Sequence, residues 1–142
     1  MLTPTFDDFR RLAAGAGLVP VYREHLADLQ TPVSVLSRFA DEDHVFLLES
    51  VEGGERWGRY SFIGVRPRAV FEVRGGRGRL LDPATGVVLE AYAEGLSSLR
   101  QAMAAARPAS LPGLPRFFGG AVGCLGYDTV NEFERLPSYP AA

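Results

Sequence analysis

The sequence predicts an α+β fold in which a mostly antiparallel β-sheet, or a pair of such sheets, is flanked by three to four helices. Apolar residues recur at helical spacing near the start of the chain and again over residues 94–106. Between these regions, residues 45–92 contain short runs typical of strands, separated by turns rich in glycine and proline. This order favours an antiparallel meander with helices around it over an alternating parallel sheet.

Length and composition are those of one globular domain. The chain has 142 residues, of which 46% are hydrophobic and 23% charged, so we expect it to bury about 68% of its unfolded surface around a genuine core. The net charge of −2, without a run of like charge at either end, argues against nucleic acid and membrane surfaces as partners.

The compartment that the sequence predicts is the cytoplasm. The single cysteine, Cys124, excludes an internal disulfide and fits a reducing environment. The first eleven residues lack the layout of a signal peptide, and no apolar stretch is long enough to span a bilayer.

The first elements are a helix and a short strand. Residues 5–16 read as a helix because five apolar or small residues recur near helical spacing, and Thr5 with Asp8 matches a capping box. The same pattern makes Asp7 and Asp8 a helix end rather than a catalytic pair of carboxylates. Residues 19–25 then predict a short strand.

A second helix is predicted to begin at Thr31. Pro32 would occupy its first turn, where a missing N–H costs nothing. The residues of this helix expected to face the core are Val35, Leu36 and Phe39.

Five strand-like runs follow, and we expect the first two to pair as neighbours. They are Val45–Val51, Arg59–Val65, Ala69–Arg74, Arg79–Asp82 and Val87–Tyr92. A charged, glycine-rich loop separates the first two. Turns are expected at Gly75-Gly76 and over residues 82–86.

The last part of the chain predicts two more helices and a glycine-dense segment. Residues 94–106 carry one apolar stripe. Residues 117–127 are apolar and rich in glycine, and Cys124 is expected to pack there. Asp128 is expected to cap a final helix whose Val130 and Phe133 look inward.

The end of the first strand-like run combines apolar and polar side chains in a way that suits a binding site. Alternation places Leu48 and Ser50 on one face, and Leu47, Glu49 and Val51 on the other. Leu48 offers apolar contact to a ring, and the Ser50 hydroxyl can bond the ammonium or carboxylate of an amino acid. The pattern alone, however, favours a plain strand whose last serine satisfies a turn.

Four motifs in order give the chain a resemblance to a known family. It resembles the amino-terminal region of anthranilate synthase component I, among the chorismate-utilising enzymes. The motifs are Thr31-Pro32-Val33, Phe46-Leu47-Leu48-Glu49-Ser50-Val51, Gly58-Arg59-Tyr60-Ser61-Phe62-Ile63-Gly64 and the segment from Phe118 to Asp128.

The resemblance implies regulation by L-tryptophan. It makes Ser50 the principal tryptophan-binding residue, with Leu48 and Glu49 beside it and Arg59 as a weaker candidate for the ligand's carboxylate. Residues 1–136 would form a regulatory domain, inactive alone, and residues 137–142 a linker toward a chorismate-binding catalytic domain that nothing in this chain matches.

The complete enzyme implied by the resemblance is a lyase. It would convert chorismate, with ammonia from a glutamine amidotransferase subunit (component II), into anthranilate and pyruvate. Magnesium would act in the catalytic domain, and no cofactor is expected in this segment. Two alternatives stay open: the equivalent segment of aminodeoxychorismate synthase component I, and a freestanding amino-acid-binding module without catalysis.

Other patterns in the sequence give weaker evidence for a binding or catalytic site. The glycines of residues 117–127 lack the spacing of a dinucleotide fingerprint, and His25 and His44 have no companions at metal-ligand spacing. Five arginines between residues 66 and 79 would suit phosphate or carboxylate, although a solvated hairpin face is the favoured interpretation. They are Arg66, Arg68, Arg74, Arg77 and Arg79.

Overall fold

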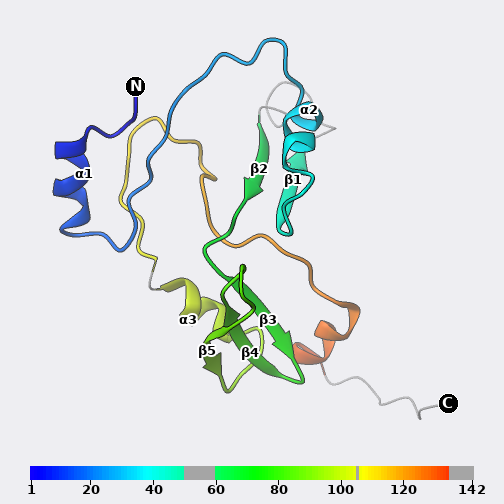
Figure 1. The fold of residues 1–142 in the computed structure, drawn as a ribbon. Coiled ribbons are helices and arrows are strands. Elements are labelled where there is room, and N and C mark those ends of the chain that lie inside the picture. Colours follow the sequence, from blue (N-terminus) through cyan, green and yellow to red (C-terminus); the bar gives the residue numbers. More distant parts are fainter. Residues whose placement is uncertain (50–59, 105, 135–142) are drawn as a thin grey trace.

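Two small antiparallel sheets and three short α-helices make up the chain in a computed structural model, described for residues 1–49, 60–104 and 106–134. Figure 1 shows the two sheets one above the other, with α2 beside the first sheet and α3 beside the second. The α+β fold with antiparallel pairing is therefore confirmed. The strands divide between two sheets instead of forming one meander.

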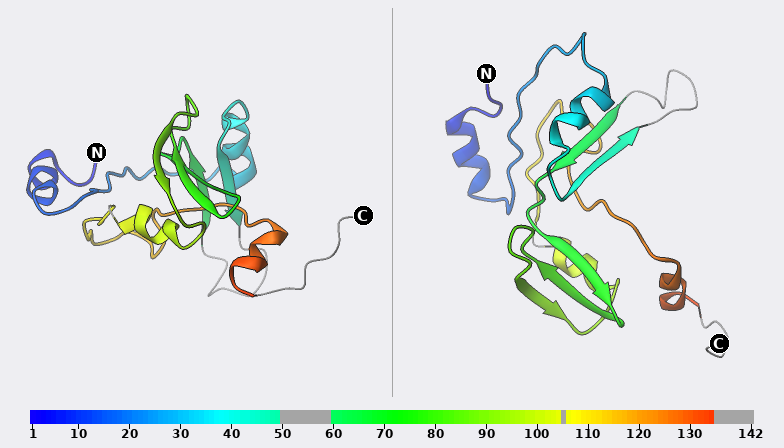
Figure 2. Two further views of the ribbon diagram at one scale, coloured as in Figure 1. Left: turned by 90° about the horizontal axis from the view of Figure 1, so that it is seen from below. Right: turned by 45° about the vertical axis from the view of Figure 1, so that its right-hand side comes forward.

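Helix α1 spans Phe6–Ala13. Thr5 is its N-cap, as predicted, because the Thr5 hydroxyl accepts a hydrogen bond from the Asp8 backbone N–H at 3.3 Å. The Asp8 carboxylate accepts from that hydroxyl at 2.7 Å, whereas in the predicted capping box it would accept from the Thr5 backbone N–H. None of its residues is buried, and Phe6 is 74% exposed. The helix projects away from the rest of the molecule (Figure 2).

The strand predicted over residues 19–25 is wrong. Tyr22 makes one isolated bridge with Thr3, through two backbone hydrogen bonds of 2.8 and 2.9 Å. Pro4 and Pro20 flank this bridge, and neither has the N–H that a longer ladder would use.

Helix α2, Pro32–Leu36, begins as expected. The side chains of Thr31 and Ser34 each bond the other's backbone N–H, at 3.1 and 2.9 Å, which makes a capping box. A short 3-10 helix, η1, continues over Ser37–Phe39. The residues of α2 and η1 that were predicted to face the core are all half-buried: Val35, Leu36 and Phe39.

The first sheet pairs β1, Val45–Glu49, with β2, Ser61–Val65, in the expected antiparallel manner. Leu47 lies opposite Ile63, and Phe46 lies opposite Gly64. A Cβ atom on Gly64 would sit 2.0 Å from the Phe46 ring, so the ring covers the space that glycine leaves. Helix α2 contacts both strands.

The second sheet has the order β3-β4-β5, formed by Val70–Arg74, Arg77–Leu81 and Val88–Tyr92. Gly75 and Gly76 turn between the first two strands with φ of 56° and 71°, a conformation that favours glycine. In the next turn, the Asp82 carboxylate accepts hydrogen bonds from the Ala84 and Thr85 backbone N–H groups. Both turns were predicted.

Helix α3, Ser98–Ala104, begins four residues later than the sequence predicts. The reason is that the Glu94 carbonyl still belongs to the sheet region, where it accepts a hydrogen bond from the Gly78 N–H at 2.9 Å. The same carbonyl accepts a hydrogen bond from the Ser98 hydroxyl at 2.9 Å. Residues 94–97 therefore belong to the exit from the second sheet, and the helix begins only after them.

The last described element is a 3-10 helix, η2, over Tyr127–Glu132. Its N-cap is Gly126 and not Asp128, so that prediction is wrong. Val130 is half-buried as expected, whereas Phe133 is 71% exposed. Cys124 is also exposed, contrary to expectation, because residues 118–126 run over the surface and form no strand or helix.

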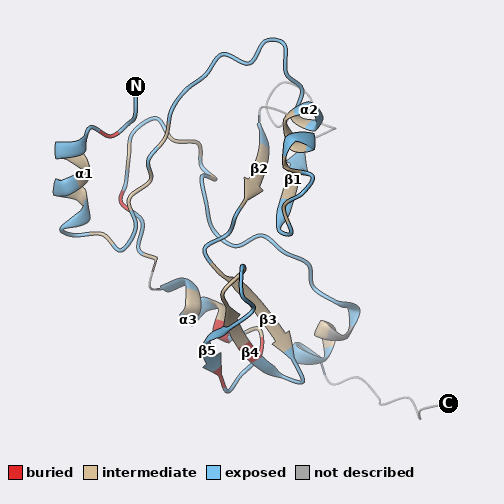
Figure 3. Cartoon of the chain, viewed as in Figure 1, coloured by how far each residue is buried: buried red, intermediate tan, exposed pale blue. Residues whose placement is uncertain are grey.

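The expected core is largely missing. Few described apolar side chains are buried: they are Tyr92, Ala109 and Pro4. Figure 3 shows exposed and half-buried residues almost everywhere. The accessible surface is 12194 Å², whereas a compact monomer of 15.4 kDa would expose about 7,200 Å². Each sheet is a single layer with little to cover it. Within the described ranges, no helix has the length and apolarity needed to cross a bilayer.

Candidate functional site

Two of the four residues predicted to bind a ligand lie at the end of β1. Leu48 and Glu49 are its last two residues. Ser50 and Arg59, the other two candidates, lie outside the described residues. The structure therefore shows the strand that leads into the candidate site and the strand that returns from it.

Leu48 lies on a face lined by aromatic side chains. It pairs across the sheet with Phe62 and is 44% exposed. The Phe62 ring stacks on Tyr60 with centroids 5.9 Å apart, and it meets Phe117 edge-on at 5.1 Å. Both geometries are favourable for aromatic pairs. This face therefore offers apolar and aromatic contact at the point where the motif begins.

Glu49 points to the other face and braces the two strands. It lies opposite Ser61, whose hydroxyl donates a hydrogen bond to a Glu49 carboxylate oxygen at 3.5 Å. This distance is long for an O–H···O bond, and both residues are exposed. The predicted alternation of Leu48 and Glu49 is confirmed, and the contact with Ser61 places Glu49 between the two strands.

The aromatic neighbours of Leu48 were not predicted as site residues. Tyr60 and Phe62 belong to the third family motif, which runs from Gly58 to Gly64. Pairing the two predicted strands in register would have placed Phe62 opposite Leu48. Phe117 is 55 positions away from Phe62 in the sequence. No local pattern indicates such a contact.

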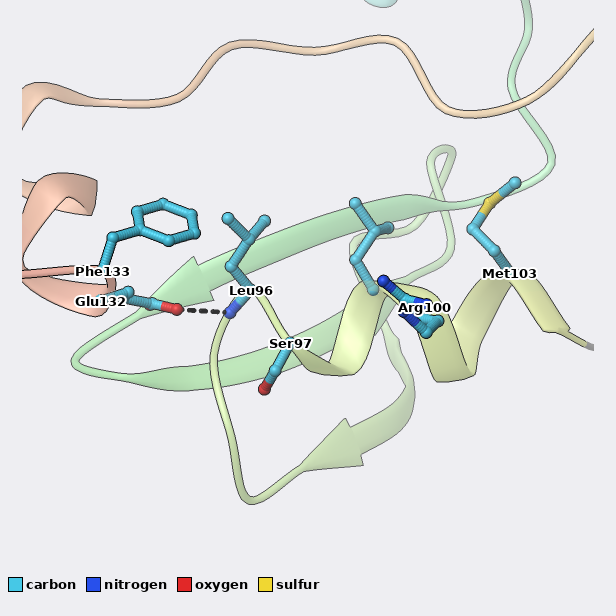
Figure 4. Close-up of a pocket in the computed structure, with 7 residues that line it drawn as sticks. Leu96, Ser97, Arg100, Met103, Glu132 and Phe133 are labelled. Atoms are coloured by element: carbon cyan, nitrogen blue, oxygen red, sulfur yellow. Dashed lines mark hydrogen bonds between the residues drawn. The ribbon is translucent and has the colours of Figure 1, made fainter.

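Two hollows lie along α3, away from Leu48. The first, of about 510 Å³, is lined by Leu96, Leu99, Met103 and Phe133, together with Ser97, Arg100 and Glu132. Figure 4 shows Glu132 reaching from η2 to the backbone N–H of Leu96, which donates to its carboxylate at 2.9 Å. The second, of about 360 Å³, lies between the end of β5 and α3. Neither hollow is lined by Leu48 or Glu49.

Three of the clustered arginines form ion pairs with nearby carboxylates. Arg74 and Arg79 both contact Glu72 at 2.6 Å, and Arg66 contacts Glu42 at 2.6 Å. These carboxylates compete with any external anion. The contacts support the favoured interpretation of a solvated hairpin face.

A resident metal ion finds no support in the part of the chain that the structure describes. No three His, Cys, Asp or Glu side chains gather there in a way that could hold one. The structure consequently assigns no residue of these ranges to magnesium.

Comparison with known proteins relates the chain to one enzyme component. It is 40% identical over 140 residues to anthranilate synthase component 1 of Acetivibrio thermocellus, 42% over 130 residues to that of Pseudomonas putida, and 43% over 138 residues to that of Pseudomonas aeruginosa. These matches cover 99%, 91% and 94% of the chain but only 28%, 26% and 28% of the relatives.

The chain thus spans little more than a quarter of the length of these curated relatives. The part matched is their amino-terminal part. No protein-family model and no solved structure matches the chain.

Proposed function

Because the chain belongs to the anthranilate synthase component 1 family, in which it matches the amino-terminal part, we propose that it is the tryptophan-binding, feedback-regulatory portion of such an enzyme. The observation that carries the proposal is the position of the motif. The described part of the motif, Leu47, Leu48 and Glu49, ends β1 beside a partly exposed face lined by Phe62, Tyr60 and Phe117.

The chemistry of that face suits an aromatic amino acid. An indole ring can stack against apolar and aromatic side chains such as Leu48 and Phe62. If the alternation of β1 continued, Ser50 would share the face of Leu48 and would bond the polar end of the ligand. Arg59 would pair with the ligand's carboxylate, and Glu49 would brace the strand through Ser61.

The complete enzyme that we propose uses chorismate. A catalytic domain beyond residues 1–136, joined through residues 137–142, would convert chorismate and ammonia into anthranilate and pyruvate, with a glutamine amidotransferase subunit as the ammonia source. Magnesium would belong to that catalytic domain. We place the enzyme in the cytoplasm, a reducing compartment that suits a chain with a single cysteine.

Inhibition would be heterotropic. Tryptophan would favour an inactive arrangement and chorismate an active one, so each ligand must weaken the binding of the other by the same factor. The site near β1 would therefore act on catalysis without contacting the reacting atoms.

The alternatives receive less support. The relatives reported above are named anthranilate synthase component 1, which favours that enzyme over aminodeoxychorismate synthase. A freestanding module would need a self-contained pocket, whereas Leu48 and Glu49 lie on exposed strand faces.

The direct test is inhibition of anthranilate formation by L-tryptophan, using the polypeptide expressed from its native gene with component II. We expect Ser50→Ala to raise the half-inhibiting concentration by about tenfold or more, as expected for losing a hydrogen bond to a charged ligand group. Turnover without tryptophan should stay largely intact.

Ser110→Ala, which changes an exposed serine far along the sequence from the motif, is the matched control and should shift the curve by less than about twofold. An unchanged curve for Ser50→Ala would remove Ser50 from the site. Wild-type protein whose anthranilate formation is not inhibited by tryptophan would overturn the proposal as a whole.

A further inference from the structure

The link between the two sheets contains a strained residue. β2 ends at Val65 and β3 begins at Val70, so residues 66–69 carry the chain from one sheet to the other (Figure 1). The first of them, Arg66, has φ of 50°, a left-handed conformation that residues other than glycine rarely adopt. Such a residue persists only where the surrounding structure holds it in place.

Pro67 leaves Arg66 with two main backbone states. A residue before proline is disfavoured in the right-handed helical region, because the proline ring clashes with its backbone and Cβ atom. Extended backbone is then the ordinary alternative to the left-handed conformation seen here. A change from one state to the other would redirect the chain as it leaves β2. The link is therefore an element with two discrete arrangements.

One ion pair fastens Arg66 to the first sheet. The Nε of Arg66 donates a hydrogen bond to a Glu42 carboxylate oxygen at 2.8 Å, and a terminal guanidinium nitrogen lies 2.6 Å from the same oxygen. Glu42 precedes β1 at the end of the ladder where Val45 pairs with Val65. Its side chain is only 26% exposed, which limits the positions that the carboxylate can take.

The other ion pairs of the arginine cluster do not involve the first sheet. Arg74 and Arg79 both contact Glu72, and all three residues belong to the second sheet. Among the described elements, no strand of one sheet packs extensively against a strand of the other. The orientation of the first sheet relative to the second therefore depends largely on the link.

We propose that Arg66 is a two-state corner, and that its ion pair with Glu42 holds the corner in the left-handed state and thereby sets the orientation of the two sheets. Loss of the ion pair lets Arg66 adopt extended backbone, and the first sheet turns as a unit. Leu48 and Glu49, at the end of β1, move with it. The corner acts whether or not a ligand occupies the first sheet.

The distance between the sheets tests this proposal. Nitroxide labels are introduced as unnatural amino acids at Val33, on α2 beside the first sheet, and at Arg77, on β4; both residues are exposed. Pulsed electron paramagnetic resonance then measures the distance between the labels in the polypeptide produced from the native gene, without tryptophan. One distance should dominate when the corner is unaltered. Two distances of equal weight would contradict a corner that Glu42 holds.

A matched pair of substitutions tests the ion pair. Glu42→Gln removes the charge at nearly constant size and should raise the population of a second distance by about threefold, a modest change because Arg66 is 76% exposed. Asp43→Asn removes the same charge one residue later, at an exposed side chain with no ion pair to any described residue, and should leave the distances unchanged. Raising the salt from about 0.1 M to about 1 M should imitate Glu42→Gln in the wild type only.

Substitutions of Arg66 itself separate the two backbone states. Both Arg66→Gly and Arg66→Val remove the ion pair, but glycine adopts a positive φ without strain, whereas a β-branched residue rarely does. Arg66→Val should therefore shift most molecules to the second distance, and Arg66→Gly should populate both. Amide protection in β1 to β5 shows whether the sheets stay folded.

The proposal is overturned by one unchanged distance in both Glu42→Gln and Arg66→Val while the sheets stay protected. It is equally overturned if Asp43→Asn shifts the distances as much as Glu42→Gln does. Should Arg66→Val lose amide protection, the comparison of Glu42→Gln with Asp43→Asn decides. Because tryptophan is absent throughout, the feedback proposal can fail while the corner stands.

Discussion

The two sheets of this molecule differ in how far they are completed by the chain itself. In the second sheet, Tyr92 is buried and its ring packs against Phe71 at 5.8 Å, while Gly78 is held by a hydrogen bond to Glu94. In the first sheet no described residue is buried, although it has its own aromatic contacts. The sheet that carries the proposed ligand-binding motif is thus the less supported one.

This difference indicates that the two sheets have different roles. The second sheet, with α3 beside it, has the contacts of a scaffold. The first sheet ends in polar groups next to open apolar faces, which is the state expected of an element that a ligand and a partner complete. Stability and binding then depend on different parts of the chain.

The largest expected effect comes from removing one aromatic ring from each sheet. Tyr92→Ala should lower the free energy of unfolding by about 3 kcal/mol, because it empties a buried site. Phe62→Ala should cost only about 1 kcal/mol, because the ring is half-buried and loses mainly its aromatic contacts. Urea unfolding of both variants measures the difference. Equal losses would show that the two sheets are equally supported.

A second pair compares the glycines that aromatic rings cover. A Cβ on Gly78 would lie 2.9 Å from the Phe71 ring and 3.1 Å from the Glu94 carbonyl oxygen, so Gly78→Ala should cost about 2 kcal/mol. Gly64→Ala meets the far end of the Phe46 side chain, which can swing outward in the less covered sheet, and should cost under about 1 kcal/mol. Thermal unfolding tests the order, and the reverse order would contradict the comparison.

Replacing a turn glycine of the second sheet should lower the free energy of unfolding by a smaller amount. Gly76 has φ of 71°, so Gly76→Ala should cost about 1 kcal/mol. Gly123 has open space around its Cβ position, and Gly123→Ala should be neutral or slightly stabilising because it restricts the unfolded chain. The same unfolding assay compares the two, and a costly Gly123→Ala would reveal a contact in the glycine-dense segment.

Acid should weaken the second sheet slightly at its β4–β5 turn. The side-chain hydrogen bond from Thr85, helped by backbone N–H groups, lowers the pKa of Asp82. A lowered folded pKa gives stability that is present above the ordinary aspartate value of about 3.9 and is lost as the pH falls through the folded value. Asp82→Asn should remove this dependence. Amide exchange in β4 and β5, measured from about pH 5 down to about pH 2, would show this loss of stability. An identical pH profile in Asp82→Asn would contradict the prediction.

Local chemistry explains which elements could be predicted from the sequence. Thr5, Thr31 and Gly75-Gly76 act within a few residues, so their caps and turn follow from short patterns. The α+β class and the pairing of β1 with β2 follow from periodicity and neighbourhood. Alternation likewise placed Leu48 and Glu49 on opposite faces.

The failures arise where distant parts of the chain decide the outcome. Residues 19–25 have strand composition, but within the described ranges they form a single bridge, between Tyr22 and Thr3. Glu94 continues the sheet region because Gly78 bonds it, which delays α3. The contact of Phe117 with Phe62 also joins remote segments. The missing core could not be predicted from composition, because 46% hydrophobic residues do not say whether the chain covers them itself.

One measurement tests the regulatory role of the first sheet most directly: amide exchange, with and without L-tryptophan, on the polypeptide produced from the native gene. Tryptophan is expected to slow exchange in β1 and β2 by about tenfold or more, because ligand binding stabilises the state that it selects, whereas exchange in β4 should change little. Exchange in β1 and β2 that tryptophan leaves unaltered would contradict it.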